Sequence, residues 1–377
     1  SILFFTSPVV VYYANNFLPD TISFAFVLIA WYLFSRYYHS GHLKHLNLSL
    51  LFFALAGLLK ITSAINVIAI VCIYILNLAG LRNLGLNKDS FHLNLKTILP
   101  FLSYFLLIIS WYFFAFYYNS THQATYFSTR MWPIWQLSGE TLEWIGDQLR
   151  NYWFADYYHL SVFILFLAGF MLILVFHKKT KPFLLTLTLL LFSGVVLFVL
   201  LWFYAFGNHD YYIIGLMILP VFILLTVLDM MAQANRYLIR SWIVKVLFSL
   251  FVLFNIYYAE KRLDWRYYGW INEYPVFKDL HTVTPYLRSL GIKPEDKVIS
   301  IPDETACYSL YMMNQKGWTE GFLYNRDSLG IQESISLGAR YLVLTGGEAK
   351  QRPYLQYFMK NKIGEYNDIS IYSLTDY

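Results

Sequence analysis

The sequence predicts an α-helical polytopic membrane protein that ends in a small α/β domain outside the membrane. The chain has 377 residues, of which 58% are hydrophobic and only 14% are charged, whereas soluble domains usually carry about a quarter charged residues. Apolar runs of roughly 20 residues, the length that crosses a bilayer as a helix, recur throughout residues 1–259. Charge then rises and the apolar runs shorten in residues 260–377, so we expect two domains that divide there.

About eight full spans are expected in residues 1–259, after a partial first one at Ile2–Tyr13. The full spans are Thr21–Tyr38, Leu46–Leu59, Ile61–Leu81, Thr97–Tyr118, Leu160–Phe176, Pro182–Ala205, Tyr211–Leu228 and Trp242–Ala259. Lys60 interrupts a stretch that is too long for one spanning helix at 1.5 Å per residue. We therefore predict two helices that turn at Lys60. The alternative is one long tilted helix with a snorkelling lysine.

The basic residues of the loops predict the orientation of the bundle. With alternate loops on the same side, eleven lysines and arginines fall on one side, and only Lys60, Arg130 and Arg150 fall on the other. Loops rich in lysine and arginine remain cytoplasmic. The outer face therefore holds Lys60, Asp20 and a tryptophan-rich loop at residues 119–159.

Residues 260–377 alternate between predicted strands and helices, which is typical of a small α/β domain. Strands are expected at Lys297–Ile301, Arg340–Thr345 and Ile369–Leu374, and helices at Phe277–Leu290, Thr305–Met313 and Tyr354–Asn361. An even number of crossings separates this domain from the Lys60 turn. We therefore place it on the outer face.

A short polar segment, Phe206–Tyr212, separates two predicted spans and has to lie at the membrane surface. Its candidates for binding a lipid phosphate or a sugar are His209, Asp210, Tyr211 and Tyr212. An imidazole and tyrosine hydroxyls, together with a lysine cation, can bind a phosphate through charge-assisted hydrogen bonds. The alternative is an interfacial belt of aromatic residues around a polar turn.

Three charged residues complete the candidate site on the outer face. Asp20 follows Pro19 at a predicted helix start, where an acid also favours the helix dipole. Lys60 is either a phosphate ligand or a snorkelling anchor. Arg130, in the tryptophan-rich loop, is a further candidate to assist a phosphate, although its spacing gives no independent support. Ionisable residues at the membrane are functional candidates when several converge.

The sequence indicates no cofactor and no metal site. Cys72 and Cys307 lie in different settings and have no metal-ligand spacing, although a divalent cation between Asp20 and His209 stays open. The net charge of +5 comes without an extended basic patch. It indicates anchoring at membrane lipids, with no nucleic acid as partner.

Three segments resemble the GT-C type membrane glycosyltransferases, especially the bacterial relatives of protein O-mannosyltransferases and the aminoarabinose transferases of lipid A. They are Tyr13–Asp20, Ala54–Thr62, and Asn208–Tyr212 with Pro220 eight residues later. The resemblance implies a GT-C-like bundle in the bacterial inner membrane. The C-terminal domain would then lie in the periplasm, and the enzyme would be mannosyltransferase-like and act in the cell envelope.

The resemblance also implies a reaction, the transfer of a sugar from a polyprenyl-phosphate carrier to an outer-face lipid, glycan or protein. Asp20 would be the second acid of the active site and would orient the acceptor or donor. The substrate-binding residues would be Lys60, His209, Asp210, Tyr211, Tyr212 and Arg130. These enzymes place their principal acid in a first outer loop that this chain lacks. We therefore expect a missing N-terminal segment, and no activity from these 377 residues alone.

Two other functions stay open on the sequence alone. A transporter or flippase for lipid-linked sugars would hold the headgroup with the same residues, but such proteins usually show internal repeats and broken helices. No convincing repeat is present in the chain. A catalytically inactive scaffold that binds lipid-linked sugars is the other alternative.

Overall fold

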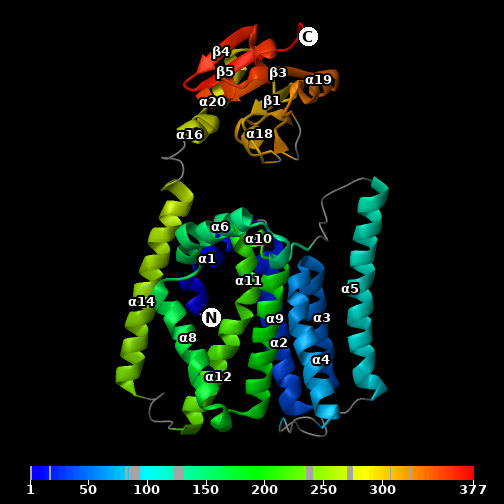
Figure 1. Ribbon diagram of the computed structural model, residues 1–377, viewed down its shortest axis with the longest axis vertical. Coiled ribbons are helices and arrows are strands. Elements are labelled where there is room, and N and C mark those ends of the chain that lie inside the picture. The colour runs from blue at the N-terminus through cyan, green and yellow to red at the C-terminus, as the bar shows by residue number, and fades with distance from the viewer. Residues whose placement is uncertain are drawn as a thin grey trace. The chain divides into compact units, whose positions relative to one another are not determined.

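The computed structural model describes residues 2–16, 18–80, 84, 94–122, 131–234, 241–269, 275–305, 307–321 and 325–377. The chain divides into two compact units, Ser1–Leu263 and Asp264–Tyr377 (Figure 1). The first is a helical bundle and the second holds a five-stranded sheet. The predicted class, a polytopic helical protein with a small C-terminal α/β domain, is confirmed.

The first unit consists of helices throughout its described residues. The elements are η1 (Ile2–Thr6), α1 (Pro8–Ala14), α2 (Pro19–Ser40), α3 (Leu43–Leu59), η2 (Ile61–Ser63), α4 (Ala64–Leu78), α5 (Leu95–His122), η3 (Ile134–Gln136), α6 (Gly139–Gln148), η4 (Leu149–Trp153), α7 (Phe154–Tyr157), α8 (Leu160–Val175), η5 (His177–Lys179), α9 (Pro182–Leu201), α10 (Ala205–Asn208), η6 (Asp210–Tyr212), α11 (Ile213–Leu216), α12 (Ile218–Ala234) and α14 (Trp242–Asp264).

Several of these helices can cross a membrane. Within the described residues, five helical stretches are long and apolar enough, and seven if each of two bent pairs counts as one span. The bent pairs are α1 with α2, and the α6–α7 segment with α8. With 17 residues, α3 is a shorter apolar helix. The protein is thus a multi-pass membrane protein, and the count of eight full spans stays a prediction.

Local sequence explains the bounds of α2. Pro19 occupies the first turn, where its missing N–H is one of the groups that a helix start leaves unbonded anyway. The helix ends at Gly41, whose φ of 70° is left-handed and suits a residue without a side chain. Its middle is buried, since Trp31 packs edge-on against Phe53 and Phe222 with ring centroids 5.6 and 4.7 Å away.

The predicted turn at Lys60 is present in the bundle. Lys60 has an extended backbone, with φ −149° and ψ 114°, which ends α3. Ser23, near the start of α2, donates to the Ala56 carbonyl at 2.9 Å and lies 2.6 Å from the Ser63 hydroxyl. The end of α3 and the start of α4 therefore meet at one place on α2. The chain reverses between them, so the alternative of one long tilted helix is wrong.

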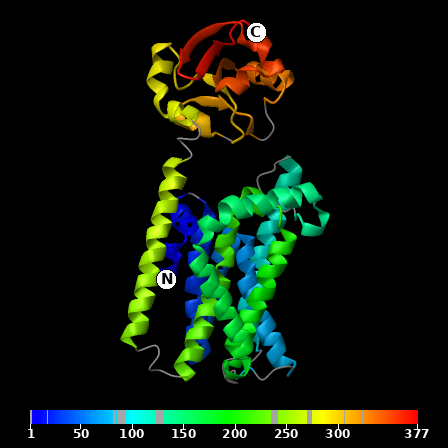
Figure 2. The same cartoon turned by 60° about the vertical axis from the view of Figure 1, so that its left-hand side comes forward.

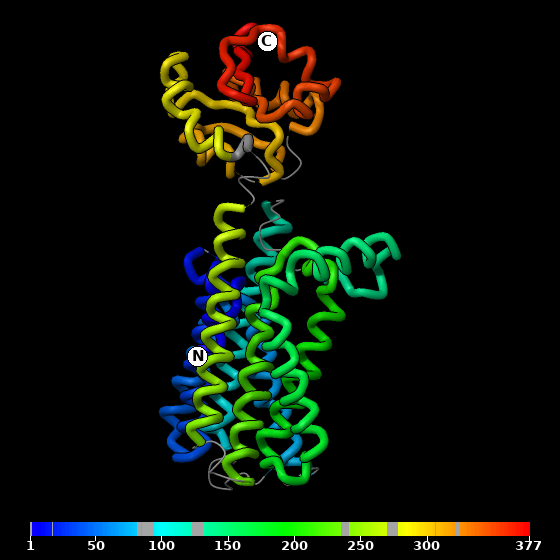
Figure 3. The backbone as a smooth tube through the Cα atoms, turned by 90° about the vertical axis from the view of Figure 1, so that its left-hand side faces the viewer, coloured from blue at the N-terminus to red at the C-terminus, as the bar shows by residue number. Residues whose placement is uncertain are grey.

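Short helices cover the end of the bundle that holds this turn. The apolar stretch Ile2–Tyr13, interpreted as the end of a span, folds as η1 and α1, because Ser7 is extended and Pro8 starts a new helix. The tryptophan-rich loop expected at residues 119–159 contains the helix α6 (Gly139–Gln148). This helix runs across the long helices of the bundle, with α10 beside it (Figures 2 and 3).

The C-terminal unit is built around a mixed sheet. Its elements are η7 (Trp265–Gly269), α16 (Pro275–Thr282), α17 (Thr284–Ser289), β1 (Lys297–Ile301), α18 (Tyr308–Met312), β2 (Lys316–Trp318), α19 (Ser328–Ser336), β3 (Ala339–Thr345), α20 (Gly347–Lys350), η9 (Pro353–Met359), β4 (Lys362–Tyr366) and β5 (Ile369–Ser373). The strand order is β2-β1-β3-β5-β4. The first three strands are parallel, and β5 runs antiparallel to both of its neighbours.

The three predicted strands are confirmed as β1, β3 and β5, most of whose residues are buried in the sheet. The predicted helices differ more. Phe277–Leu290 is divided into α16 and α17, since Pro285 starts a second helix. Thr305–Met313 is shortened to α18, and Tyr354–Asn361 is replaced by the 3₁₀ helix η9. The short strand β2, the half-exposed strand β4 and the helix α19 were not predicted.

Candidate active site in the helical bundle

Lys60 and Asp20 form an ion pair at the α3–α4 turn. Lysine Nζ lies 2.9 Å from Asp20 Oδ1, and the two side chains are 18% and 3% exposed. A charge this buried requires a partner of opposite sign. The second oxygen, Asp20 Oδ2, is also buried and has no hydrogen-bond partner in the described parts of the chain. One carboxylate oxygen therefore serves Lys60, and the other remains for a further donor.

Two tyrosine rings flank the lysine. Lys60 Nζ lies 4.1 Å from the ring centroid of Tyr212 and 5.1 Å from that of Tyr211, both within the range of cation–π attraction. The two rings are stacked, with centroids 5.3 Å apart. Both tyrosines come from the polar segment before α11, so this contact brings that segment to the Lys60 turn.

Hydrogen bonds hold the rest of the polar segment in place. Tyr13, at the end of α1, donates to Asp210 Oδ1 at 2.8 Å, and its ring packs edge-on against Tyr211 at 5.3 Å. The Tyr211 hydroxyl lies 3.2 Å from His209 Nδ1. Thr21 Oγ1 donates to the Tyr13 carbonyl at 3.1 Å. These bonds connect α1, the start of α2 and the polar segment in one cluster.

His209 is held in its neutral form. Burial lowers the pKa of His209 below its usual value of 6.5, and the like charge of Lys60 lowers it further. The carboxylates of Asp210 and Asp20 act in the opposite direction but do not outweigh burial. At pH 7 the cluster therefore carries its positive charge on Lys60.

A mostly apolar groove opens beside Lys60. Its volume is about 620 Å³, and among the described residues that line it only Lys60 is charged. The walls come from the α3–α4 turn, α5 and α9, and include Leu59, Ile108, Trp111, Tyr112, Phe198 and Trp202. Tyr112 also donates to the Gly57 carbonyl at 3.2 Å, which holds α5 against α3. Lys60, Thr62 and Tyr212 contribute polar groups to this groove.

The structure brings most of the predicted site residues together. Asp20, Lys60, His209, Asp210, Tyr211 and Tyr212 share one cluster, whereas Arg130 lies outside the described residues. Tyr13 was not predicted as a site residue, although it opens the segment that carries Asp20. No group of three or more His, Cys, Asp or Glu side chains that suits a metal ion occurs among the described residues.

The part of the chain that contains the ion pair is similar to a known protein family. Residues 1–111 match the family model of the dolichyl-phosphate-mannose-protein mannosyltransferases. This match contains Tyr13, Asp20 and Lys60, together with all elements from η1 to the middle of α5. The polar segment at His209 and the C-terminal unit lie beyond it. No curated protein and no solved structure matches the chain.

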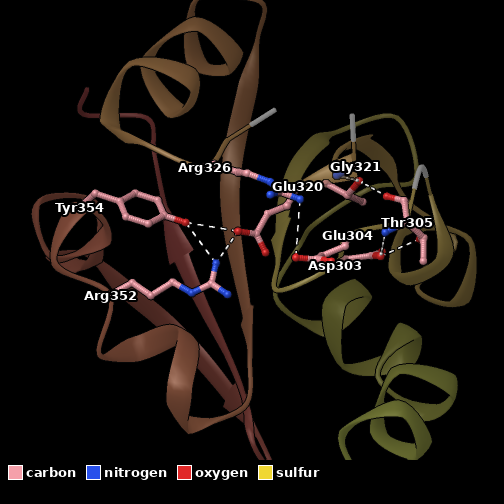
Figure 4. Close-up of polar contacts among 9 residues, drawn as sticks. Asp303, Glu304, Thr305, Glu320, Gly321, Arg326, Arg352 and Tyr354 are labelled. Atoms are coloured by element: carbon pink, nitrogen blue, oxygen red, sulfur yellow. Dashed lines mark hydrogen bonds and ion pairs between the residues drawn. The ribbon is translucent and has the colours of Figure 1, made fainter. Parts of the chain in front are cut away.

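The C-terminal unit holds a second buried acid. Glu320 follows β2, and its backbone N–H donates to the Asp303 carbonyl after β1 at 2.8 Å (Figure 4). Its Oε1 atom accepts hydrogen bonds from Arg352 and, at 3.3 Å, from Tyr354. Its Oε2 atom is buried and has no partner within the described segments. The sequence did not reveal this cluster, because its members come from three separate segments.

Arg352 is held on two sides. It pairs with Glu320 and also donates to the Tyr354 hydroxyl at 3.2 Å. Burial acts to lower the pKa of Arg352, but the hydrogen bond to Tyr354 and the charge of Glu320 outweigh it, so the pKa lies above its usual value. The pair thereby joins the end of β2 to the segment that follows α20.

Proposed function

We propose that the protein is a membrane glycosyltransferase that moves a sugar from a polyprenyl-phosphate carrier to an acceptor. The observation that carries the proposal is the Asp20–Lys60 pair beside an apolar groove. It supplies a cation for a phosphate and an unbonded carboxylate oxygen for a hydroxyl. The match of residues 1–111 to a family that uses a lipid-linked sugar supports the same function.

The donor lipid would lie along the groove with its phosphate at Lys60. The aromatic and aliphatic walls suit an isoprenoid chain, because burial of apolar surface is the main attraction available to it. The hydroxyls of Tyr211 and Tyr212 would donate to phosphate oxygens, with neutral His209 as a further donor. Asp210, held by Tyr13, would fix the segment that presents these groups.

The reaction breaks the bond between the anomeric carbon of the sugar and the phosphate oxygen. The acceptor oxygen forms a new bond to that carbon, and its proton passes to a carboxylate that acts as the general base. Negative charge develops on the leaving lipid phosphate, where a fixed cation such as Lys60 lowers the barrier. Asp20 Oδ2 would accept a hydrogen bond from a hydroxyl of the acceptor or of the donor sugar and orient it.

The acceptor is a lipid, glycan or protein on the outer face of a bacterial inner membrane, with the C-terminal domain in the periplasm. This part of the proposal depends on the loop charges, which favour a cytoplasmic side opposite Lys60. Arg130 belongs to the same proposed face. A transporter or an inactive scaffold would bind the same donor without transferring its sugar.

Mass spectrometry of cell-envelope glycans tests the proposal in the native host. We expect that deletion of the gene removes one sugar modification and that the wild-type gene restores it. A gene carrying Asp20→Asn should not restore the modification, although the protein should reach the membrane at its normal level. Lys44→Gln, a charge change outside the cluster, is the matched control and should restore it.

Other outcomes would overturn the proposal. Restoration by Asp20→Asn would remove Asp20 from the reaction. If deletion instead leaves the sugar attached to its carrier on the cytoplasmic leaflet, the protein moves the lipid and does not transfer the sugar. Unchanged glycans and carrier lipids would favour the scaffold.

A further inference from the structure

We propose that a second lipid site, for an anionic phospholipid, lies between α2, α9 and α12 at the end of the bundle opposite Lys60. A cavity of about 470 Å³ separates these three helices. Its α2 residues run from Leu28 to His39, whereas Asp20 lies in the first turn of that helix. This site is therefore distinct from the groove at Lys60, and it does not depend on the proposed function.

The cavity has apolar walls that suit acyl chains. Trp31 and Phe34 line it from α2, Leu187 from α9 and Leu225 from α12. Trp31, Phe34 and Leu187 are buried, whereas Leu225 is 48% exposed. Because these helices are apolar enough to face a bilayer, a cavity that reaches an exposed leucine of this kind is open to lipid.

The mouth of the cavity is polar. Lys181, just before α9, forms an ion pair with Asp229 of α12, and both line the cavity. The other oxygen of Asp229 accepts a hydrogen bond from Gln233 at 2.5 Å, so the carboxylate is shared between two donors. The Lys181 side chain remains 57% exposed and can reach a second anion.

The surrounding charge favours an anionic headgroup. Lys178 and Lys179 lie in η5, immediately before Lys181, and are exposed. Arg36 of α2 is exposed and donates to the hydroxyl of Tyr32, a lining residue, at 3.3 Å. Lys178, Lys179 and Arg36 thus add three exposed cations on segments next to the cavity, whereas Lys181 and Asp229 neutralise each other. Basic residues at the end of membrane helices attract anionic lipid headgroups, so the charge selects a phospholipid such as phosphatidylglycerol over a zwitterionic one.

Photo-crosslinking with a lipid probe tests this site. The full chain is reconstituted in phosphatidylcholine nanodiscs that contain a few per cent of phosphatidylglycerol with a diazirine in one acyl chain, and the labelled peptides are mapped by mass spectrometry. Labelling should concentrate on the cavity-lining parts of α2, α9 and α12. Excess unlabelled phosphatidylglycerol should suppress it several-fold, and excess phosphatidylcholine should not.

Pairs of variants distinguish a specific lipid site from general contact with the bilayer. Lys178→Gln with Lys179→Gln should reduce labelling several-fold while the Lys181–Asp229 pair stays intact. Leu225→Trp, which fills the exposed side of the cavity, should reduce labelling without changing any charge. Lys44→Gln with Lys245→Gln removes the same amount of charge elsewhere in the bundle and should have no effect.

Three results would overturn the proposal. The first is labelling that is spread evenly over α5 and α14 as well. The second is competition by phosphatidylcholine that equals the competition by phosphatidylglycerol. The third is a loss of labelling in Lys44→Gln with Lys245→Gln that equals the loss in Lys178→Gln with Lys179→Gln. Thermal unfolding of each variant in detergent shows that the bundle remains folded.

Discussion

Two buried acids in this protein have similar partners and different surroundings. Asp20 pairs with Lys60 in the bundle, and Glu320 pairs with Arg352 in the C-terminal unit. Their side chains are 3% and 5% exposed, and each has one oxygen without a partner among the described residues. Lys60, however, lines a groove of about 620 Å³, whereas Arg352 is bound to Tyr354 as well.

The comparison shows that a buried ion pair alone does not identify a reaction site. Lysine carries a compact charge on a flexible stem, and arginine carries a planar fork that fits fixed acceptors. Lys60 can therefore turn toward a bound phosphate, while Arg352 is held by Glu320 and Tyr354. We infer that the first pair serves substrates and that the second stabilises the connection between β2 and the segment after α20.

The largest expected effect belongs to Asp20→Asn. The carboxamide keeps the shape of the side chain but loses its charge, so sugar transfer should fall by about 100-fold or more, as for other groups that act in a transition state. Initial rates of the complete gene product with a radiolabelled lipid-linked sugar in proteoliposomes measure this. A rate within threefold of the wild-type rate would show that Asp20 has only a structural role, as we infer for Glu320.

Arg352→Met should affect stability and leave transfer nearly unchanged. The variant leaves Glu320 buried without a cation, which should destabilise the C-terminal unit by about 1–3 kcal/mol. The loss of stability is measured by chemical denaturation, in which resistance of the C-terminal unit to proteolysis reports the folded fraction. Glu320→Gln together with Arg352→Met is the matched control, and it should recover part of the stability because no charge remains buried. An equal loss of stability in the single and the double variant would contradict a stabilising ion pair between Glu320 and Arg352.

Lys60→Ala should weaken binding of polyprenyl phosphate by about tenfold or more, since a charge-assisted contact typically contributes about 1.5–3 kcal/mol. Lys60→Arg should retain most of the affinity if charge alone is needed. Titration of the lipid against the protein in nanodiscs gives both values. Unchanged affinity in Lys60→Ala would return this residue to the role of a membrane anchor.

The smallest expected effect is the pH dependence from His209. Because burial lowers the pKa of His209 below 6.5, His209 becomes charged only at a lower pH than a free imidazole. Affinity for a lipid phosphodiester, whose charge is constant there, should then rise a few-fold as the pH falls below 6.5. His209→Gln should abolish this rise.

The stability of the bundle should respond to pH in the opposite direction. The unfolded chain takes up the His209 proton first, so the stability of the bundle should decrease as the pH falls below 6.5. Thermal unfolding without lipid at pH 7.5 and 5.5 checks this. A pH response that persists in His209→Gln would assign both effects to another group.

Sequence reasoning located the bundle site because its members stand at predictable places. Pro19 starts a helix, Lys60 interrupts an apolar stretch, and the segment at His209 joins two spans, so all three had to lie at helix ends. The partnership of Tyr13 with Asp210 was not predictable, since it depends on the packing of α1 against η6.

The Glu320 cluster was beyond sequence reasoning for a related reason. Strand β2 has only three residues, too few to show a strand pattern. Arg352 and Tyr354 reach Glu320 from a segment more than 30 positions later in the chain. Contacts between distant segments leave no local periodicity, whereas helix ends and interrupted apolar runs do.

Gly57 of α3 faces α5. A β-carbon at this position would stand 2.9 Å from Ile108 Cδ1 and 3.5 Å from the Tyr104 hydroxyl, and Ile108 also lines the groove at Lys60. A side chain at position 57 would therefore have to displace the end of the Ile108 side chain. Because Ile108 lines the groove, a substitution at Gly57 would reshape the apolar wall of the groove and leave Lys60 and its polar partners in place.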